Sequence, residues 1–170
     1  MVLKFRKMRN GVTGSTLTAV HDDRFTRLGR FLAKSKLDEI PQLWNVLRGQ
    51  MSLVGPRPED ANFVALYGES SADILGVRPG ITGLSQLAFA REAEILDEVD
   101  RERDYVSRIL PQKIHLDRFY AANCSFRMNV RILVWTVAAV LFHRDVAVNR
   151  RTGDLRTRVR PATASIAEAA

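Results

Sequence analysis

The feature that most restricts the fold of this chain lies in its C-terminal third. Ser125 is a good N-cap for a helix that we expect to reach about Phe142. Its apolar side chains form one stripe of Met128, Ile132, Trp135 and Ala139, and most of the remaining circumference carries Val130, Leu133, Val134, Val137 and Leu141. A helix that is apolar all round must be buried or lie in a membrane interface, and 170 residues offer limited interior. Both placements stay open. The apolar run, 132–142, is shorter than the roughly 18–20 residues that span a bilayer.

The remaining pattern predicts a small α+β domain that is mostly helical and has a few short strands. We expect one folded domain over residues 1–147, followed by a basic, Ala-rich disordered tail over 148–170. The expected elements before the last helix are a strand at 2–6, a helix at 25–35 capped by Asp22 or Asp23, a strand at 51–54, a short helix at 62–67, a possible strand at 84–89, an exposed helix or ordered loop at 91–106, and a helix at 113–123.

A pair of carboxylates, Asp38 and Glu39, stands just ahead of another amphipathic pattern. Apolar residues follow at the i, i+3, i+4 and i+7 positions of one helix face, namely Ile40, Leu43, Trp44 and Leu47. We predict that Asp38 is the N-cap of this helix. Pro41 would then be the N3 residue and would have no N–H to donate, so Asp38 could close only onto N2. A carboxylate with spare hydrogen-bonding capacity at the positive end of a helix suits attack on phosphorus, and a carboxylate pair suits Mg²⁺. The simpler interpretation is that Asp38 only caps the helix.

Two arginines are held by prolines. Arg57 lies between Pro56 and Pro58, and Arg78 precedes Pro79. Proline fixes its own φ and restricts the residue before it, so each guanidinium should be presented at low entropic cost for a bidentate phosphate contact. The alternative is a rigid loop in which Arg57 pairs with a neighbouring carboxylate.

The balance of charge favours anionic partners. The chain has 26 Lys and Arg against 19 Asp and Glu, a formal net charge of +7. Arg24, Arg27 and Arg30 recur every third residue, and this ridge could bind phosphates or lipid headgroups or could simply be solvated. Nucleic acid is an unlikely partner, because the arginines of the tail have no aromatic residues beside them to stack bases. The only cysteine, Cys124, excludes an internal disulfide and fits a reducing compartment.

Three motifs in order resemble one known family. Arg30-Phe31-Leu32 leads into Leu37-Asp38-Glu39-Ile40-Pro41-Gln42-Leu43-Trp44-Asn45-Val46-Leu47, and then follow the segments Met51-Ser52-Leu53-Val54-Gly55-Pro56-Arg57-Pro58-Glu59 and Arg78-Pro79-Gly80-Ile81-Thr82-Gly83-Leu84. From about residue 4 to about residue 144 the chain resembles the bacterial sugar transferases, the monotopic phosphoglycosyl transferases that begin the assembly of surface polysaccharides.

This resemblance implies a function. Sugar 1-phosphate would pass from a UDP-sugar to polyprenyl phosphate through an aspartyl-phosphosugar intermediate, and this would initiate exopolysaccharide, O-antigen or capsule synthesis at the cytoplasmic face of the inner membrane. Asp38 would be the nucleophile, and Glu39 would help it to hold Mg²⁺. Lys4 would lie near the donor phosphates, which Arg57 and Arg78 would orient with help from Arg24 and Arg30.

The sequence departs from the family pattern in two places. Members normally carry a hydrophobic N-terminal helix before the Lys-Phe-Arg motif, whereas Lys4-Phe5-Arg6 comes almost at once here. The resemblance therefore implies a truncated chain, a misplaced start or another means of membrane contact. An arginine usually stands five residues before the Asp-Glu pair, where this chain has Ala33; Lys34 or Lys36 could substitute as a point charge. Two alternatives follow: a catalytically idle homologue, or a basic adaptor that binds membranes or nucleic acid.

Overall fold

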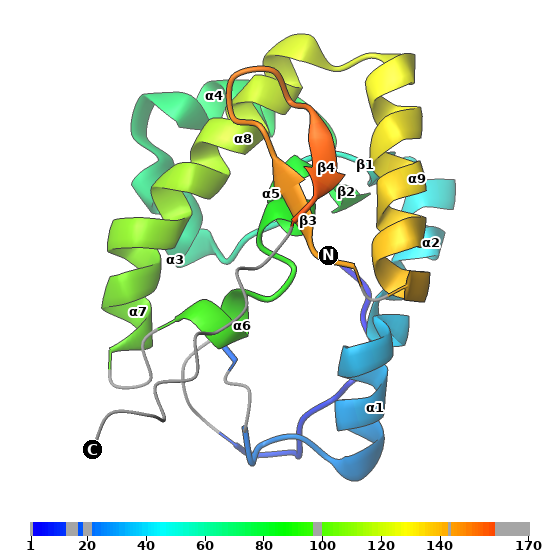
Figure 1. Ribbon diagram of the computed structural model, residues 1–170. Coiled ribbons are helices and arrows are strands. Elements are labelled where there is room, and N and C mark those ends of the chain that lie inside the picture. Colours follow the sequence, from blue (N-terminus) through cyan, green and yellow to red (C-terminus); the bar gives the residue numbers. More distant parts are fainter. Residues whose placement is uncertain (1, 13–16, 19–21, 97–99, 143, 159–170) are drawn as a thin grey trace, which may run out of the picture.

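Two helical segments flank the short elements of the fold. The computed structural model describes residues 2–12, 17–18, 22–96, 100–142 and 144–158. In it, α7 (Arg101–Asp104) continues through a π-helical turn, Tyr105–Ile109, into α8 (Leu110–Asn123) (Figure 1). Pro111 is tolerated in the first turn of α8, where its missing N–H has no helical partner. After a two-residue break, α9 (Phe126–Phe142) runs on the other side of the molecule.

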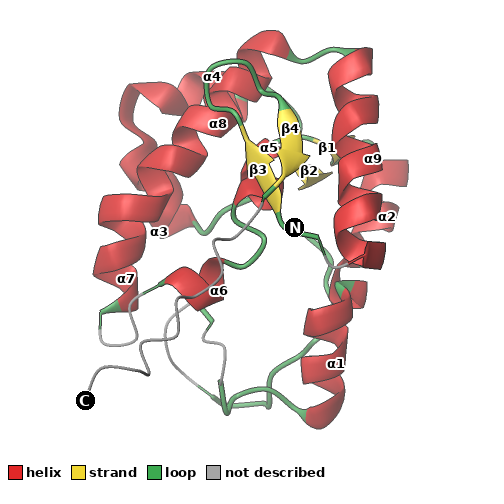
Figure 2. Cartoon of the chain, viewed as in Figure 1, coloured by secondary structure: helices red, strands yellow, loops and turns green. Residues whose placement is uncertain are grey.

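The other helices are short. They are α1 (Arg27–Ser35), α2 (Gln42–Leu47), α3 (Ala61–Val64), α4 (Ser71–Leu75), α5 (Leu84–Ala88) and α6 (Glu92–Ile95), with 3₁₀ turns at Leu37–Glu39 and Ala65–Ser70. Helices dominate, and the strands form two small pairs (Figure 2). The α+β, mostly helical class predicted from the sequence is confirmed.

Both strand pairs are two-stranded. β1 (Ser52–Val54) pairs in parallel with β2 (Gly80–Thr82), with Ser52 opposite Gly80. The backbones of the two paired segments approach closely: a Cβ on Gly80 would lie 2.1 Å from the backbone N of Gly55, so only glycine fits there. β3 (Val146–Val148) and β4 (Leu155–Thr157) form an antiparallel hairpin.

This hairpin differs from the disordered tail predicted from residue 148. Val146 and Leu155 are buried in the core, and this burial stabilises the turn between the strands. Residues 159–170, which complete the predicted tail, lie outside the described residues.

Two apolar clusters form the core. One includes Phe63 and Tyr105, whose ring centroids are 4.7 Å apart. It joins the 3₁₀ turn at Ala65–Ser70 and α4 to the π-helical turn. The other surrounds Leu84, Leu116 and Ile132 and joins α5, α8 and α9 to the β-hairpin. Cavities described below lie between these clusters and the first 40 residues.

Several elements differ from the sequence predictions. Residues 2–6 form no strand, and the segment makes one isolated bridge, Met8 to Phe25. Residues 84–89 form helix α5 rather than a strand, because the helix buries Leu84, Ser85 and Leu87 together. Thr26, not Asp22 or Asp23, caps α1: its hydroxyl accepts a hydrogen bond of 2.8 Å from the Gly29 N–H.

The apolar face predicted for α2 points outward. Leu43, Trp44 and Leu47 are exposed, whereas the polar residues Gln42 and Asn45 are buried. Asn45 is buried because its Oδ1 accepts the Leu3 N–H at 3.0 Å and its Nδ2 donates to Gln50 at 2.7 Å. An ordinary core helix would have the opposite orientation.

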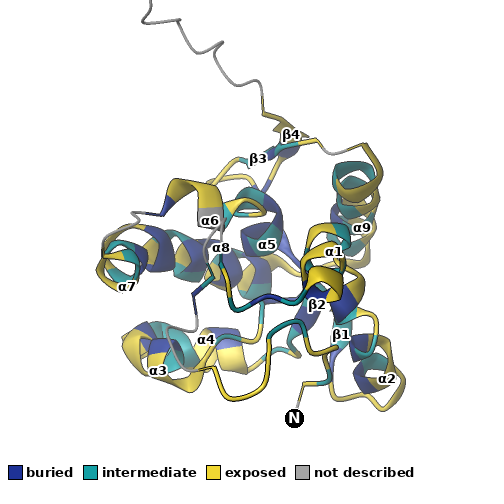
Figure 3. Ribbon diagram, turned by 90° about the horizontal axis from the view of Figure 1, so that it is seen from below, coloured by how far each residue is buried: buried dark blue, intermediate teal, exposed yellow. Residues whose placement is uncertain are grey.

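α9 is buried on one face and exposed to solvent on the other. Ile132 is completely buried, and Met128, Trp135 and Ala139 pack on the core beside it. The opposite face is exposed, with the apolar residues Phe126, Val134, Val137, Leu141 and Phe142. α1, α2 and α9 lie on the same side of the molecule and carry exposed surface (Figure 3). Of the helices within the described ranges, none combines the length and apolarity needed to cross a bilayer.

Candidate active site

Asp38 lies in the 3₁₀ turn between α1 and α2. Lys36, just before the turn, is the one described non-glycine residue with a positive φ, 59°, and it reverses the chain after α1. The N-cap of α2 is Pro41, which makes no side-chain cap bond, so the prediction that Asp38 caps this helix is wrong. The carboxylate instead turns inward and is 2% exposed.

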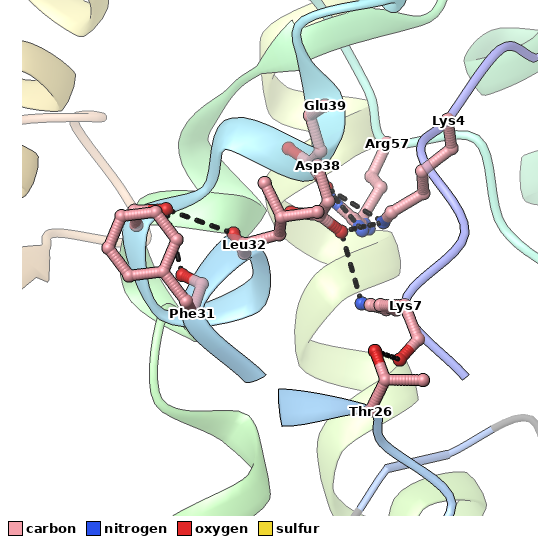
Figure 4. A network of polar contacts seen from close by, with 9 residues as sticks. Lys4, Lys7, Thr26, Phe31, Leu32, Asp38, Glu39 and Arg57 are labelled. Carbon is pink, nitrogen blue, oxygen red and sulfur yellow. Dashed lines mark hydrogen bonds and ion pairs between the residues drawn. The ribbon is translucent and has the colours of Figure 1, made fainter. Parts of the chain in front are cut away.

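Two lysines from the N-terminal segment meet this carboxylate. The Nζ atoms of Lys4 and Lys7 each lie 3.2 Å from Asp38 Oδ2 (Figure 4). Burial and the neighbouring Lys4 charge lower the pKa of Lys7, and the contact with Asp38 opposes this only in part. Two ammonium groups therefore compensate the charge of one buried carboxylate.

Backbone contacts hold this segment in place. The Phe5 N–H donates to the Asp38 carbonyl at 3.0 Å, and the Thr26 N–H donates to the Lys7 carbonyl at 3.0 Å. Gly29 permits the second contact, since a Cβ there would lie 1.9 Å from the Lys7 oxygen. The lysines thus reach Asp38 from an extended segment that packs against α1 and the 3₁₀ turn.

Glu39 continues the same network. Its Oε1 lies 3.1 Å from Lys4 Nζ and 3.0 Å from Arg57 Nη2 (Figure 4). Burial would raise the pKa of Glu39, but the positive charges of Arg57 and Lys4 outweigh burial and hold it below its ordinary value. Burial would lower the pKa of Arg57. The negative charges of Glu39, Glu59 and Glu92 outweigh burial and raise this pKa. Arg57 therefore lies between two groups of carboxylates.

These side chains line a cavity of about 440 Å³, within the size range of small-molecule sites. Its wall comes from the N-terminal segment, the 3₁₀ turn, the Gly-Pro-Arg-Pro loop, α5, α6 and α8. The charged and polar side chains among its lining residues are Lys4, Lys7, Thr18, Lys36, Asp38, Glu39, Arg57, Glu59, Asp60, Ser85, Gln86, Glu92 and Lys113.

A second charged cluster stands in the same wall. Lys113 Nζ, on a side chain that is largely buried, lies 2.6 Å from Glu59 Oε1 and 3.1 Å from Glu92 Oε2, and it donates to the Tyr105 hydroxyl at 2.9 Å. Burial opposes the ammonium charge, yet Glu92 and Glu59 outweigh burial and raise the Lys113 pKa. One turn further along α8, burial raises the pKa of Asp117 to about 7, although a hydrogen bond with Ser85 and the charge of Lys113 oppose this.

The structure brings together four of the seven predicted site residues: Lys4, Asp38, Glu39 and Arg57. Arg78, Arg24 and Arg30 do not line the cavity. Arg78 is exposed just before β2, where its carbonyl rather than its side chain packs toward Gly55. Arg24 pairs with Asp22 at 2.6 Å, and Arg30 is exposed on the outer face of α1.

Sequence reasoning missed Lys7, Gln86 and Lys113 as cavity residues. Lys7 carried a weak signal, since it belongs to the basic cluster that contains Lys4. Gln86 lies in α5, two residues after the third motif, and Lys113 lies in α8, far from all three motifs; no spacing rule connects either residue to Asp38. Ala33 also lines the cavity; of the two lysines offered as substitutes for the missing arginine, Lys36 lines it and Lys34 does not.

The donor set fits Mg²⁺ only with help from a substrate. Asp38 Oδ2 is buried and accepts no well-formed hydrogen bond from the described residues, and Glu39 is its neighbour on the same wall. Within the described ranges no three His, Cys, Asp or Glu side chains cluster to hold a metal. Mg²⁺ is commonly bound by one or two carboxylates with substrate phosphates, and Asp38 and Glu39 match that arrangement.

An apolar cavity of about 260 Å³ adjoins the charged one. Lys36, Glu39, Arg57, Gln86 and Ala90 line both cavities. The rest of its wall comes from α2, β2, α5 and α9 and is mostly apolar: Ile40, Leu43, Ile81, Thr82, Leu87, Thr136, Ala139 and Val140. The Glu39–Arg57 ion pair thus lies where a polar and an apolar cavity meet.

A buried carboxylate held by two ammonium groups, with an arginine in the same cavity wall, suits chemistry on a phosphorylated substrate. Comparison with known proteins defines the group more closely. The family model for bacterial sugar transferases matches residues 1–143, and the chain belongs to this family.

Curated relatives are similar over most of this chain. An uncharacterized sugar transferase, EpsL, of Bacillus subtilis is 37% identical over 143 residues, which are 84% of this chain and 63% of the relative. The UDP-glucose:undecaprenyl-phosphate glucose-1-phosphate transferase of Xanthomonas campestris is 37% identical over 82% of this chain and 28% of its own length. The exopolysaccharide production protein PSS of Rhizobium leguminosarum is 38% identical over 82% of this chain and 70% of its own length. The chain spans less than two thirds of the first two relatives.

Proposed function

We propose that this protein is a phosphoglycosyl transferase. It transfers sugar 1-phosphate from a UDP-sugar to polyprenyl phosphate through an aspartyl-phosphosugar intermediate, and this initiates exopolysaccharide, O-antigen or capsule assembly. The observation that carries the proposal is the buried Asp38 carboxylate, 3.2 Å from both Lys4 and Lys7, in the wall of a cavity lined with charged side chains. The names of the Xanthomonas and Rhizobium relatives support the donor, the acceptor and the pathway.

In the first step an Asp38 oxygen attacks the sugar-bearing β-phosphorus of the donor. The bond from this phosphorus to the bridging oxygen of the diphosphate breaks, UMP leaves with the electron pair, and an acyl phosphate forms on Asp38. As the attack consumes the charge of Asp38, Lys4 and Lys7 can transfer their contacts to the phosphoryl oxygens. Cations that stabilise the developing charge in this way lower the barrier rather than only binding the substrate.

Asp38 and Glu39 would hold Mg²⁺ together with the diphosphate. When bound, the ion would neutralise charge on the diphosphate as electrons move to the leaving group. Arg57, which contacts the same Glu39 oxygen at 3.0 Å that Lys4 contacts at 3.1 Å, orients the phosphates. Arg78, Arg24 and Arg30 lie outside the cavity lining, which argues against a direct part for them in this step.

In the second step a phosphate oxygen of polyprenyl phosphate attacks the phosphorus of the intermediate and releases Asp38. The apolar cavity beside Glu39 and Arg57 suits the lipid end of this acceptor, and Arg57 and Lys36 at its boundary suit the phosphate. Exposed apolar residues on α2 and α9 suit contact with the cytoplasmic face of the inner membrane.

Mass spectrometry of the intact chain tests the proposal. With Mg²⁺ and UDP-glucose, we expect a mass increase of one hexose phosphate on Asp38 and release of UMP, and both should vanish in Asp38→Asn. Asp60→Asn is the matched control, because Asp60 lines the same cavity but only caps α3 through Asn62. Release of UMP by Asp38→Asn at the rate of the unsubstituted chain contradicts the mechanism.

Ala33 supports one rival function, that of a catalytically idle homologue, because it removes an expected cation from the cavity wall. Such a protein would bind UDP-sugar and release no UMP. A basic adaptor would instead bind anionic vesicles or oligonucleotides with no dependence on Asp38 or Mg²⁺.

A further inference from the structure

The charged cavity has two regions with opposite balances of charge. Around Asp38 and Glu39, the three cations Lys4, Lys7 and Arg57 outnumber the two carboxylates with which they pair. Around Lys113, the carboxylates of Glu59 and Glu92 outnumber the single ammonium group. Arg57 connects the regions, since it pairs with Glu39 at 3.0 Å and precedes Glu59 by two residues in the same loop.

These regions suit different parts of one ligand. The first attracts a diphosphate. The second repels phosphate, because its excess charge is negative and Lys113 is already paired twice. A group that is neutral, rich in hydroxyls and attached to the diphosphate fits the second region. Carboxylates accept hydrogen bonds from hydroxyls, and an ammonium group donates to them.

Further groups around this region are suited to a sugar. Gln86 Nε2 is buried and donates to no acceptor among the described residues, although polar atoms in the interior are normally paired. Phe63 and Phe89 line the same cavity and offer apolar surface for the C–H faces of a pyranose ring. The combination of an apolar wall with a few fixed polar groups is typical of sites that orient a small molecule.

We propose that Glu59, Glu92 and Lys113 bind the sugar hydroxyls of the donor and determine which sugar the protein accepts. The inference rests on the proposed function, since it takes the diphosphate to lie at Asp38. Tyr105 holds Lys113 from behind at 2.9 Å and keeps its Nζ between the two carboxylates. A buried ion-pair cluster could also serve only to fasten α8 to the Gly-Pro-Arg-Pro loop and α6, and the experiment separates these roles.

The experiment measures binding by calorimetry in the Asp38→Asn background, where the donor is not consumed. The ligands are UMP, UDP-glucose and its C4 epimer UDP-galactose, each with Mg²⁺. Glu59→Gln and Glu92→Gln keep the side-chain shape and remove one charge. Glu94→Gln is the matched control on α6, because Glu94 pairs with exposed Arg91 and lies outside the cavity lining. Circular dichroism establishes that each variant is folded.

We expect Glu59→Gln and Glu92→Gln to change the ratio of UDP-glucose to UDP-galactose affinity at least fivefold and UMP affinity less than twofold. Glu94→Gln should change neither. Equal changes in affinity for all three ligands, or no change for any, would overturn the inference and indicate a structural cluster. A parent protein that binds the two UDP-hexoses equally well would also overturn it. Failure of the proposed chemistry has a different signature: no adduct forms on Asp38, while selective sugar binding persists.

Discussion

Asp38 differs from an ordinary buried carboxylate in the source of its charge partners. Both ammonium groups come from an extended N-terminal segment, and neither comes from the helices beside Asp38. Removing one partner of a buried ion pair usually destabilises a protein strongly, because the other charge remains without compensation. Two partners allow Asp38 to keep one lysine when the second turns toward a substrate phosphate.

A carboxyl group on α8 should make stability depend on pH. Burial raises the pKa of Asp117 to about 7 from an ordinary 3.8, so between about pH 4 and pH 7 the folded chain binds more protons than the unfolded chain. The free energy of unfolding therefore falls as pH rises through this window, by a few kcal/mol at most, at roughly 1.4 kcal/mol per unit of pKa difference. Asp117→Asn cannot titrate, so we expect its melting temperature relative to the unsubstituted chain to increase from pH 4.5 to pH 7.5. A constant difference across this range contradicts the prediction.

The motifs identified some site residues and missed others for a physical reason. Asp38, Glu39 and Arg57 were found because a local pattern of helix, proline and charge restricts each of them. Arg78 has the same local pattern but faces solvent, since proline fixes the backbone and does not determine which side chain turns inward. Lys113 was identified as a cavity residue only from the structure, in which α8 packs against the loop that carries Glu59.

At the scale of elements, α1 holds the lysines in place through one glycine. Gly29→Ala would put a Cβ 1.9 Å from the Lys7 carbonyl oxygen, and backbone cannot give way there as a flexible side chain could. We expect a loss of roughly 1–3 kcal/mol in the free energy of unfolding, as for other overpacked sites. Adduct formation on Asp38 should also slow, because Lys7 moves away from Asp38.

Arg30→Ala is the control on the same helix, because Arg30 is exposed and alanine favours helix. Urea denaturation measures stability, and intact-mass analysis with UDP-glucose measures the adduct. Full stability of Gly29→Ala would mean that the N-terminal segment does not pack on α1 as described.

Long helices were easier to predict than short elements. The helices at 113–123 and 125–142 were expected close to their observed bounds, because several turns of regular spacing define a face. Residues 84–89 were predicted only as a possible strand, since a short apolar run fits either structure and only packing on α8 and α9 decides between them. The β3–β4 hairpin was missed because its strands have only three residues each.

The whole molecule presents apolar surface mainly on one side. Leu43 and Trp44 on α2 are about half exposed, and α9 beside them exposes Val134 and Leu141. We expect the chain to sediment with vesicles that contain anionic lipid, and Leu43→Ser with Trp44→Ser to reduce this binding at least fivefold. Leu75→Ser is the control, because Leu75 is 61% exposed on α4 on the other side of the molecule. Equal losses in both proteins would locate the contact elsewhere.

The wall shared by the two cavities has a consequence for how the substrates meet. Glu39 and Arg57 line both the charged cavity and the apolar one. In the proposed reaction, the sugar nucleotide would occupy the charged cavity and the lipid acceptor the apolar one. We therefore expect the lipid to wait in its compartment while the nucleotide departs, so that the reactive acyl phosphate is exposed to water only briefly.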